Sequence, residues 1–145
     1  QSEISGLKEA LEGSGSEIRW CIYRRKGQHI VERIKAEKRA DTLVVLDAGV
    51  LGGVGEQAEQ GKDRGAELYG VGYSLRTTAL LDQGNIQGLI VPDGYEIGYR
   101  SVEEMVRKIE HKFYKMQGYT TEYKVFQKDS FSMDDDLERF LYSYE

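Results

Sequence analysis

The feature that most constrains the fold of this chain is the repeated succession of a short apolar run and a helical pattern. Residues 42–46 form an apolar run that closes on Asp47, and a small-residue helical pattern follows over 48–60. Residues 68–73 and 86–91 form two similar runs, and each again precedes a helical pattern. Strands that are apolar on both faces are typical of sheets covered by helices. We therefore expect an α/β protein.

The same alternation predicts how many strands the sheet has and how they are ordered. Residues 18–23 and 123–126, which are rich in β-branched and aromatic side chains, are expected to form a first and a fifth strand. Right-handed crossovers then give a three-layer doubly wound parallel five-stranded sheet of order 2-1-3-4-5, counted from residues 18–23. Such a domain is a flavodoxin-like single lobe. The helices are expected at residues 4–12, 28–39, 48–60, 76–83 and 95–116.

The length of the chain suits one domain. Its 145 residues fall within the range that a single hydrophobic core serves. We predict that residues 1–131 form one α/β lobe. Residues 132–145 are predicted to be an acidic, amphipathic tail that packs on the lobe or crosses away from it, beginning at the run Asp134 to Asp136.

Charge and reactive side chains exclude several classes of function. The net charge of −5 argues against binding of nucleic acid, which requires a basic face. The single cysteine, Cys21, cannot form an internal disulfide, is a poor basis for a structural metal site, and is expected in the core. His29 and His111 lie in helical patterns away from the strand ends, so we expect no catalytic pair with Ser or Cys. The chain is expected to be no enzyme and to need no metal or cofactor.

Candidate ligand-binding residues follow the predicted strands. Doubly wound sheets bind ligands beyond the carboxyl ends of their strands, where the order of the strands reverses. The polar and aromatic residues of this sequence that fall at such ends are Arg24, Asp47, Tyr73, Ser74, Asp93 and Tyr95.

Each of these residues also has a purely structural interpretation. Asp47 is equally suited to cap the helix that follows it, and the two roles are compatible. Tyr73 and Tyr95 could stack on a ring of a bound ligand, but a chain with ten tyrosines places some of them at strand ends by chance. Arg24 suits an anionic ligand, although a solvated loop is the commoner role for such a residue.

Glycines cluster after two of the strands. The series that begins at Gly49 and ends at Gly55 does not have the spacing of a dinucleotide-binding loop, so we interpret it as close packing of a helix on the sheet. Gly70 and Gly72 within a strand pattern predict a close approach of another segment to the backbone.

Three segments together resemble a known family. They are LVVLDAGVLG at residues 43–52, LYGVGYS at 68–74 and IVPDGYEIG at 90–98. Their order and spacing resemble the C-terminal lobe of type I periplasmic sugar-binding proteins, which are related to the ligand-sensing domains of lactose-repressor-like regulators. The segment from Lys128 to Phe131 resembles the closing segment of the transport proteins and favours the transport or sensor branch.

The resemblance implies a function. The chain is expected to be the carbohydrate-binding half of an extracytoplasmic solute-binding or sensor protein, and a fragment of a two-lobed chain. Its implied partners are a small-molecule ligand, the missing N-terminal lobe, and a membrane permease or sensor. The implied location is the periplasm or the cell surface, with a lipid anchor possible in the parent protein.

Two alternatives stay open. The chain could be the effector-sensing domain of a cytoplasmic lactose-repressor-like regulator. It could also be an isolated flavodoxin-like domain, either a receiver or a small enzyme, although Tyr23 and Arg24 do not supply the acidic pair that a receiver has after its first strand. Ser74 stands where the sugar-binding family has Asp, and Pro92 where it has Gln. These departures predict a less polar ligand, weaker binding or a loss of binding.

Overall fold

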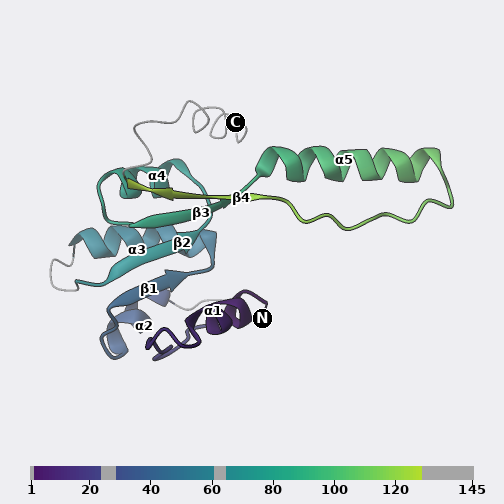
Figure 1. The fold of residues 1–145 in the computed structure, drawn as a ribbon. Coiled ribbons are helices and arrows are strands. Elements are labelled where there is room, and N and C mark those ends of the chain that lie inside the picture. Colours follow the sequence, from purple (N-terminus) through teal and green to yellow (C-terminus); the bar gives the residue numbers. More distant parts are fainter. Residues whose placement is uncertain (1, 24–28, 61–64, 129–145) are drawn as a thin grey trace.

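The computed structural model describes residues 2–23, 29–60 and 65–128 (Figure 1). These residues form a small α/β lobe, as the sequence predicts. The helices are α1 (Ser2–Leu11), α2 (Ile30–Ala36), α3 (Ala48–Gln60), α4 (Leu75–Asp82) and α5 (Gly94–Glu110). The strands are β1 (Thr42–Val45), β2 (Glu67–Val71), β3 (Gly88–Pro92) and β4 (Tyr123–Gln127).

The described strands form one sheet in the order β1-β2-β3-β4. β1 pairs with β2 and β2 with β3 in parallel, with Val44 opposite Tyr69 and Val71 opposite Ile90. β4 pairs with β3 in antiparallel register, with Val125 opposite Ile90. The sheet is therefore mixed, and the expectation of an all-parallel sheet is wrong at its last strand.

The prediction of a first strand at residues 18–23 is also wrong. Residues 18–23 belong to no helix or strand, so β1 pairs directly with β2 and the order 2-1-3-4-5 becomes 2-3-4-5 in the predicted numbering. The segment is held by side chains instead. The Trp20 indole donates to the Lys38 carbonyl at 2.8 Å, and Arg19 donates to the carbonyl of Arg39. Cys21 is exposed and not in the core.

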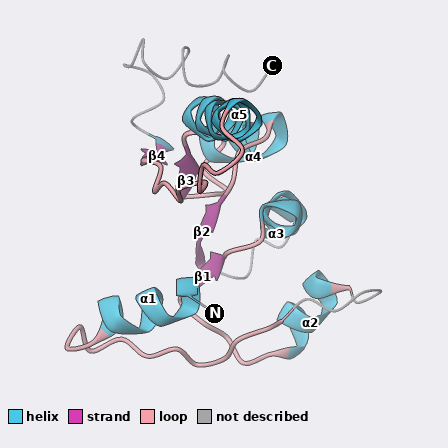
Figure 2. Cartoon of the chain, turned by 90° about the vertical axis from the view of Figure 1, so that its right-hand side faces the viewer, coloured by secondary structure: helices cyan, strands magenta, loops and turns pink. Residues whose placement is uncertain are grey.

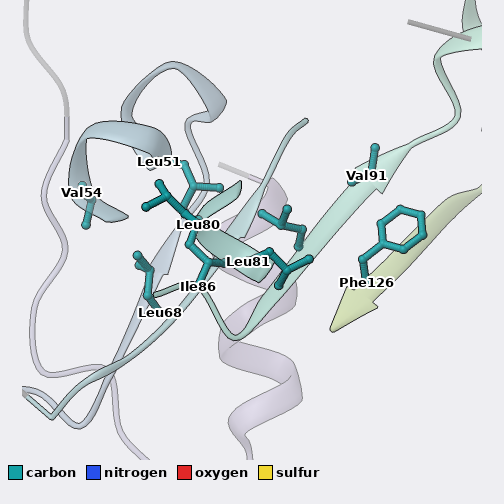
Figure 3. Packing of buried hydrophobic residues seen from close by; sticks show 9 residues of the cluster. Leu51, Val54, Leu68, Leu80, Leu81, Ile86, Val91 and Phe126 are labelled. Carbon is teal, nitrogen blue, oxygen red and sulfur yellow. The ribbon is translucent and has the colours of Figure 1, made fainter. Parts of the chain in front are cut away.

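α3 and α4 lie on the same side of the sheet (Figure 2) and form the core with it. Gly70 allows Leu51 of α3 to rest on β2, since a β-carbon there would collide with the leucine side chain. This confirms the predicted close approach at Gly70. The fully or nearly fully buried apolar side chains, shown in Figure 3, are Leu51, Val54, Leu68, Leu80, Leu81, Ile86, Leu89, Val91 and Phe126.

The glycines of α3 serve a contact between helices. A β-carbon at Gly55 would lie 2.8 Å from Leu80 Cδ1, and one at Gly52 would lie 2.9 Å from Arg76 Cδ. Both neighbours, Leu80 and Arg76, belong to α4. The glycines therefore allow α3 to pack closely on α4, whereas the sequence analysis predicted close packing of this helix on the sheet. An ion pair between Glu56 and Arg76 joins the same two helices.

The second helical layer is not formed by the described residues. On the face away from α3 and α4, Val44, Ile90 and Val125 are exposed. α5 leaves the carboxyl end of β3 and runs beyond the sheet, and residues 111–122 return to β4 (Figure 1). Because residues 111–122 run back towards the sheet in the direction opposite to α5, β4 pairs with β3 in antiparallel orientation. Within the described residues, the expected three layers are thus replaced by a sheet with α3 and α4 on one face.

Two expectations concern the rest of the chain. The predicted tail, residues 132–145, lies outside the described residues, as do residues 129–131 of the predicted lobe. No described helix combines the length and the apolar character that crossing a membrane requires.

Candidate functional site

The carboxyl ends of β1, β2 and β3 meet at one edge of the sheet because these strands are parallel. The turns that follow β1 and β2 are in contact. Gly72, with a φ of +119°, lies so close to Ala48 that a β-carbon would collide with the alanine side chain. The Gly72 amide also donates to the Ile90 carbonyl at 2.9 Å, which ties the end of β2 to β3. The sheet thus gathers three turns at this edge.

A polar side chain caps the helix that begins at each turn. Asp47 Oδ1 accepts a hydrogen bond from the Gly49 amide at 2.9 Å, at the start of α3. Asp93 Oδ1 accepts one from the Glu96 amide at 2.9 Å, at the start of α5. These caps satisfy amides that have no partner within the helix.

Ser74 caps α4 in a reciprocal arrangement. Its hydroxyl accepts from the Thr77 amide at 3.1 Å, and the Thr77 hydroxyl accepts from the Ser74 amide at 2.9 Å. Thr77 is buried whereas Ser74 is exposed, so the pair links the core to the surface of the candidate site.

The predicted site residues have different surroundings. Asp47 is exposed, Asp93 is half-buried, and the half-buried Tyr73 packs against the core. Tyr95 lies in the first turn of α5 and stacks on Tyr99, with the ring centroids 6.2 Å apart. Arg24 lies outside the described residues. Asp47, Tyr73 and Ser74 therefore share the turns after β1 and β2, Asp93 follows β3, and Tyr95 belongs to the helix that leaves the sheet.

One residue at this edge escaped the sequence analysis. Leu75, the first residue of α4, directly follows the Ser74 cap, and 81% of it is exposed. An apolar residue directly after a capping serine was the available sign, but the predicted helix began one residue later. Leu75 gives the edge an apolar element next to its hydroxyl and carboxylate groups.

The arrangement suits recognition of a neutral polar molecule. The two carboxylates can accept hydrogen bonds, and the hydroxyl can accept or donate them. The amino ends of α3 and α4 favour electron-rich atoms such as hydroxyl oxygens. In the described part of the chain no group of three His, Cys, Asp or Glu side chains could hold a metal ion.

Solved structures of known proteins resemble this fold, whereas no family model and no curated protein matches the sequence. GanP, a glucose-galactose binding protein from Geobacillus stearothermophilus, is 23% identical over 71% of this chain and 38% of its own, with a TM-score of 0.60. The XylFII–LytSN complex contains a chain that is 21% identical over 70% of this chain and 36% of its own, with a TM-score of 0.58.

A regulator has the same fold. A LacI transcriptional regulator from Bacteroides fragilis is 16% identical over 68% of this chain and 33% of its own, with a TM-score of 0.53. The chain thus spans well under half the length of each of these structures. Its fold is that of a single lobe of a type I periplasmic-binding-protein-like chain.

Proposed function

We propose that this chain is the ligand-binding half of an extracytoplasmic solute-binding or sensor protein, and that the ligand is a carbohydrate or a similar polyol. The observation that carries the proposal is the contact between the turns after β1 and β2, where Gly72, the neighbour of Tyr73 in sequence, lies against Ala48, the neighbour of Asp47. The resemblance to a glucose-galactose binding protein supports the class of ligand.

Each residue has a distinct role in this proposal. Asp47 and Asp93 accept hydrogen bonds from ligand hydroxyls, Ser74 supplies a hydroxyl, and the rings of Tyr73 and Tyr95 pack against the apolar face of a sugar. Arg24 is proposed at the margin of the same site. Because a single edge leaves the ligand half in water, a second lobe must close over it by a hinge motion.

The missing lobe is the first proposed partner. The chain covers 38% of GanP, which leaves room for a second lobe in a longer parent protein. The second proposed partner is a membrane permease or a sensor protein. The complex of XylFII with LytSN supports the proposal that a lobe of this fold can belong to a protein that binds a partner protein. The proposed location is the periplasm or the cell surface.

The test is a titration of the two-lobed parent protein with glucose, galactose and other monosaccharides by calorimetry. Replacing Asp47 by Asn keeps an oxygen that can cap α3 but removes the charge, so we expect the dissociation constant to rise about tenfold or more while the fold persists. Asp82→Asn is the matched control, because this exposed aspartate lies at the opposite end of α4. No heat with any carbohydrate, or equal affinities for both variants, would refute the proposal.

A second candidate is the effector-sensing domain of a lactose-repressor-like regulator, favoured by the likeness to the Bacteroides fragilis protein. This candidate places the protein in the cytoplasm and requires a DNA-binding helix-turn-helix upstream in the parent gene. Sequencing that region separates the two candidates, since the solute-binding protein requires an export signal there instead.

A further inference from the structure

α5 presents an apolar surface that nothing in the described residues covers. Side chains three or four positions apart lie on one face of a helix. The face in question, called here the α5 stripe, consists of Tyr95, Tyr99, Val102, Met105, Val106 and Ile109. All six are exposed, and 82% of Ile109 is accessible to solvent. An apolar surface of this size on a soluble protein marks a contact with another surface.

The opposite face of α5 is already occupied. Glu104, only 3% exposed, accepts hydrogen bonds from the Gln117 amide and the Tyr114 hydroxyl at 2.8 Å and from the Tyr119 hydroxyl at 3.0 Å. The Arg100 guanidinium lies 5.2 Å from the centre of the Tyr119 ring. These contacts fix the returning segment, residues 111–122, on the polar side of the helix. They therefore hold the α5 stripe outward.

The sheet has an uncovered apolar face as well. Register and alternation place five side chains on the side away from α3 and α4, called here the open sheet face: Val44, Tyr69, Val71, Ile90 and Val125. Val44, Ile90 and Val125 are each at least 40% exposed. An apolar helix face is the usual cover for such a surface in an α/β protein.

The chain thus carries both halves of a helix-on-sheet contact but does not join them. The Asp93 cap starts α5 directly at the end of β3, and the helix then runs away from the sheet (Figure 1). We propose that the α5 stripe of one copy packs on the open sheet face of a second copy, and that the second copy returns the same contact. The exchange is symmetric and closes at two chains, as a twofold interface requires.

The available area fits a stable dimer. The exposed parts of the α5 stripe and the open sheet face amount to on the order of 1,000 Å² on each copy, so both copies together reach the ~1,200–2,000 Å² that specific interfaces bury. A separate helix-to-helix contact would leave the sheet uncovered, whereas the exchange covers both surfaces. This inference does not depend on the ligand, although Tyr95 belongs both to the α5 stripe and to the candidate site.

The experiment is sedimentation equilibrium of the 145-residue chain over a range of concentrations. We expect a species of twice the 16.5 kDa chain mass. A charge buried in the interface should weaken the dimer about a hundredfold or more, so Val106→Asp on the helix and Val125→Asp on the sheet should each give monomers. Ile97→Asp is the matched control, because Ile97 is 42% exposed and lies two turns before Glu104, on the face of α5 opposite the stripe.

Mixing the two monomeric variants tests the geometry of the exchange. The intact helix of the Val125→Asp chain can still dock on the intact sheet of the Val106→Asp chain, so the mixture should associate where neither variant does alone. A dimer that Val125→Asp leaves intact would overturn the proposal in favour of a contact between helices. An unchanged chain that is monomeric at every concentration would also overturn the proposal. If Val106→Asp then unfolds more easily than the unchanged chain, α5 folds back on the sheet of its own chain.

Discussion

Gly72 ends β2 in a backbone conformation that no other residue type adopts readily. Its φ of +119° lies in the region that favours glycine, and its α-carbon faces the side chain of Ala48 without room for a β-carbon. The contact between the turns after β1 and β2 therefore depends on this one residue. Asp47 and Ser74, on either side of that contact, depend on it for their position.

Replacing Gly72 by Ala should lower the free energy of unfolding by about 3 kcal/mol, because backbone strain and steric overlap add. Urea denaturation measures the change. Gly53→Ala is the control, since a β-carbon at this position in α3 meets nothing within 4 Å. We expect that control to stabilise the protein by up to about 1 kcal/mol. Equal stabilities of the two variants would contradict the described packing at Gly72.

At the scale of the element, α5 and its returning segment form a unit held by a buried carboxylate. The Gln117 amide and the hydroxyls of Tyr114 and Tyr119 stabilise the charged form of Glu104, which lowers its pKa from the ordinary 4.5 although burial acts in the opposite sense. A group with a lowered pKa stabilises the folded state above its ordinary value, and the effect is lost as the pH falls through the folded-state value. The unit should therefore loosen in acid.

Amide hydrogen exchange at Gln117 measures this loosening. We expect the protection factor, the rate of an unfolded amide divided by the observed rate at the same pH, to fall below pH 4.5 in the native chain. Glu104→Gln should show low protection already at neutral pH. Glu110→Gln is the control, because Glu110 is exposed at the end of the same helix. Slow exchange at Gln117 in the Glu104→Gln variant at neutral pH would show that the carboxylate does not hold the segment.

The starts of three helices follow directly from the sequence. Asp47, Ser74 and Asp93 stand directly before α3, α4 and α5, and each side chain caps its helix. Capping involves residues that are neighbours in sequence, so helix starts are among the features that a sequence encodes most directly. The end of α5 was harder to place, since the apolar spacing continues past Glu110 to Met116 although the helix stops.

At the scale of the whole molecule, one layer of helices on one face of a four-stranded sheet forms the core of the described residues. Leu81 of α4 is fully buried within it, whereas Leu75 of the same helix is exposed. The free energy of unfolding of the lobe should therefore depend on Leu81 and not on Leu75.

Replacing Leu81 by Ala should cost ~3 kcal/mol in the free energy of unfolding, from lost burial and the cavity that remains. The same substitution at Leu75 should change it by less than about 0.5 kcal/mol. Chemical denaturation of both variants measures the difference. If the two substitutions cost the same, α4 does not pack in the described orientation.

The sequence alone determined the α/β class, the positions of the four described strands and, to within one residue, the starts of the helices after the first three of them. Those features depend on apolar periodicity and on caps, which act between residues close together in the chain. Only the tertiary structure decided that residues 18–23 stay outside the sheet, that β4 runs antiparallel, and that α5 leaves the sheet with its apolar face uncovered. Strand pairing and helix docking join residues far apart in sequence, and a local pattern predicts that a surface is apolar without specifying the surface that covers it.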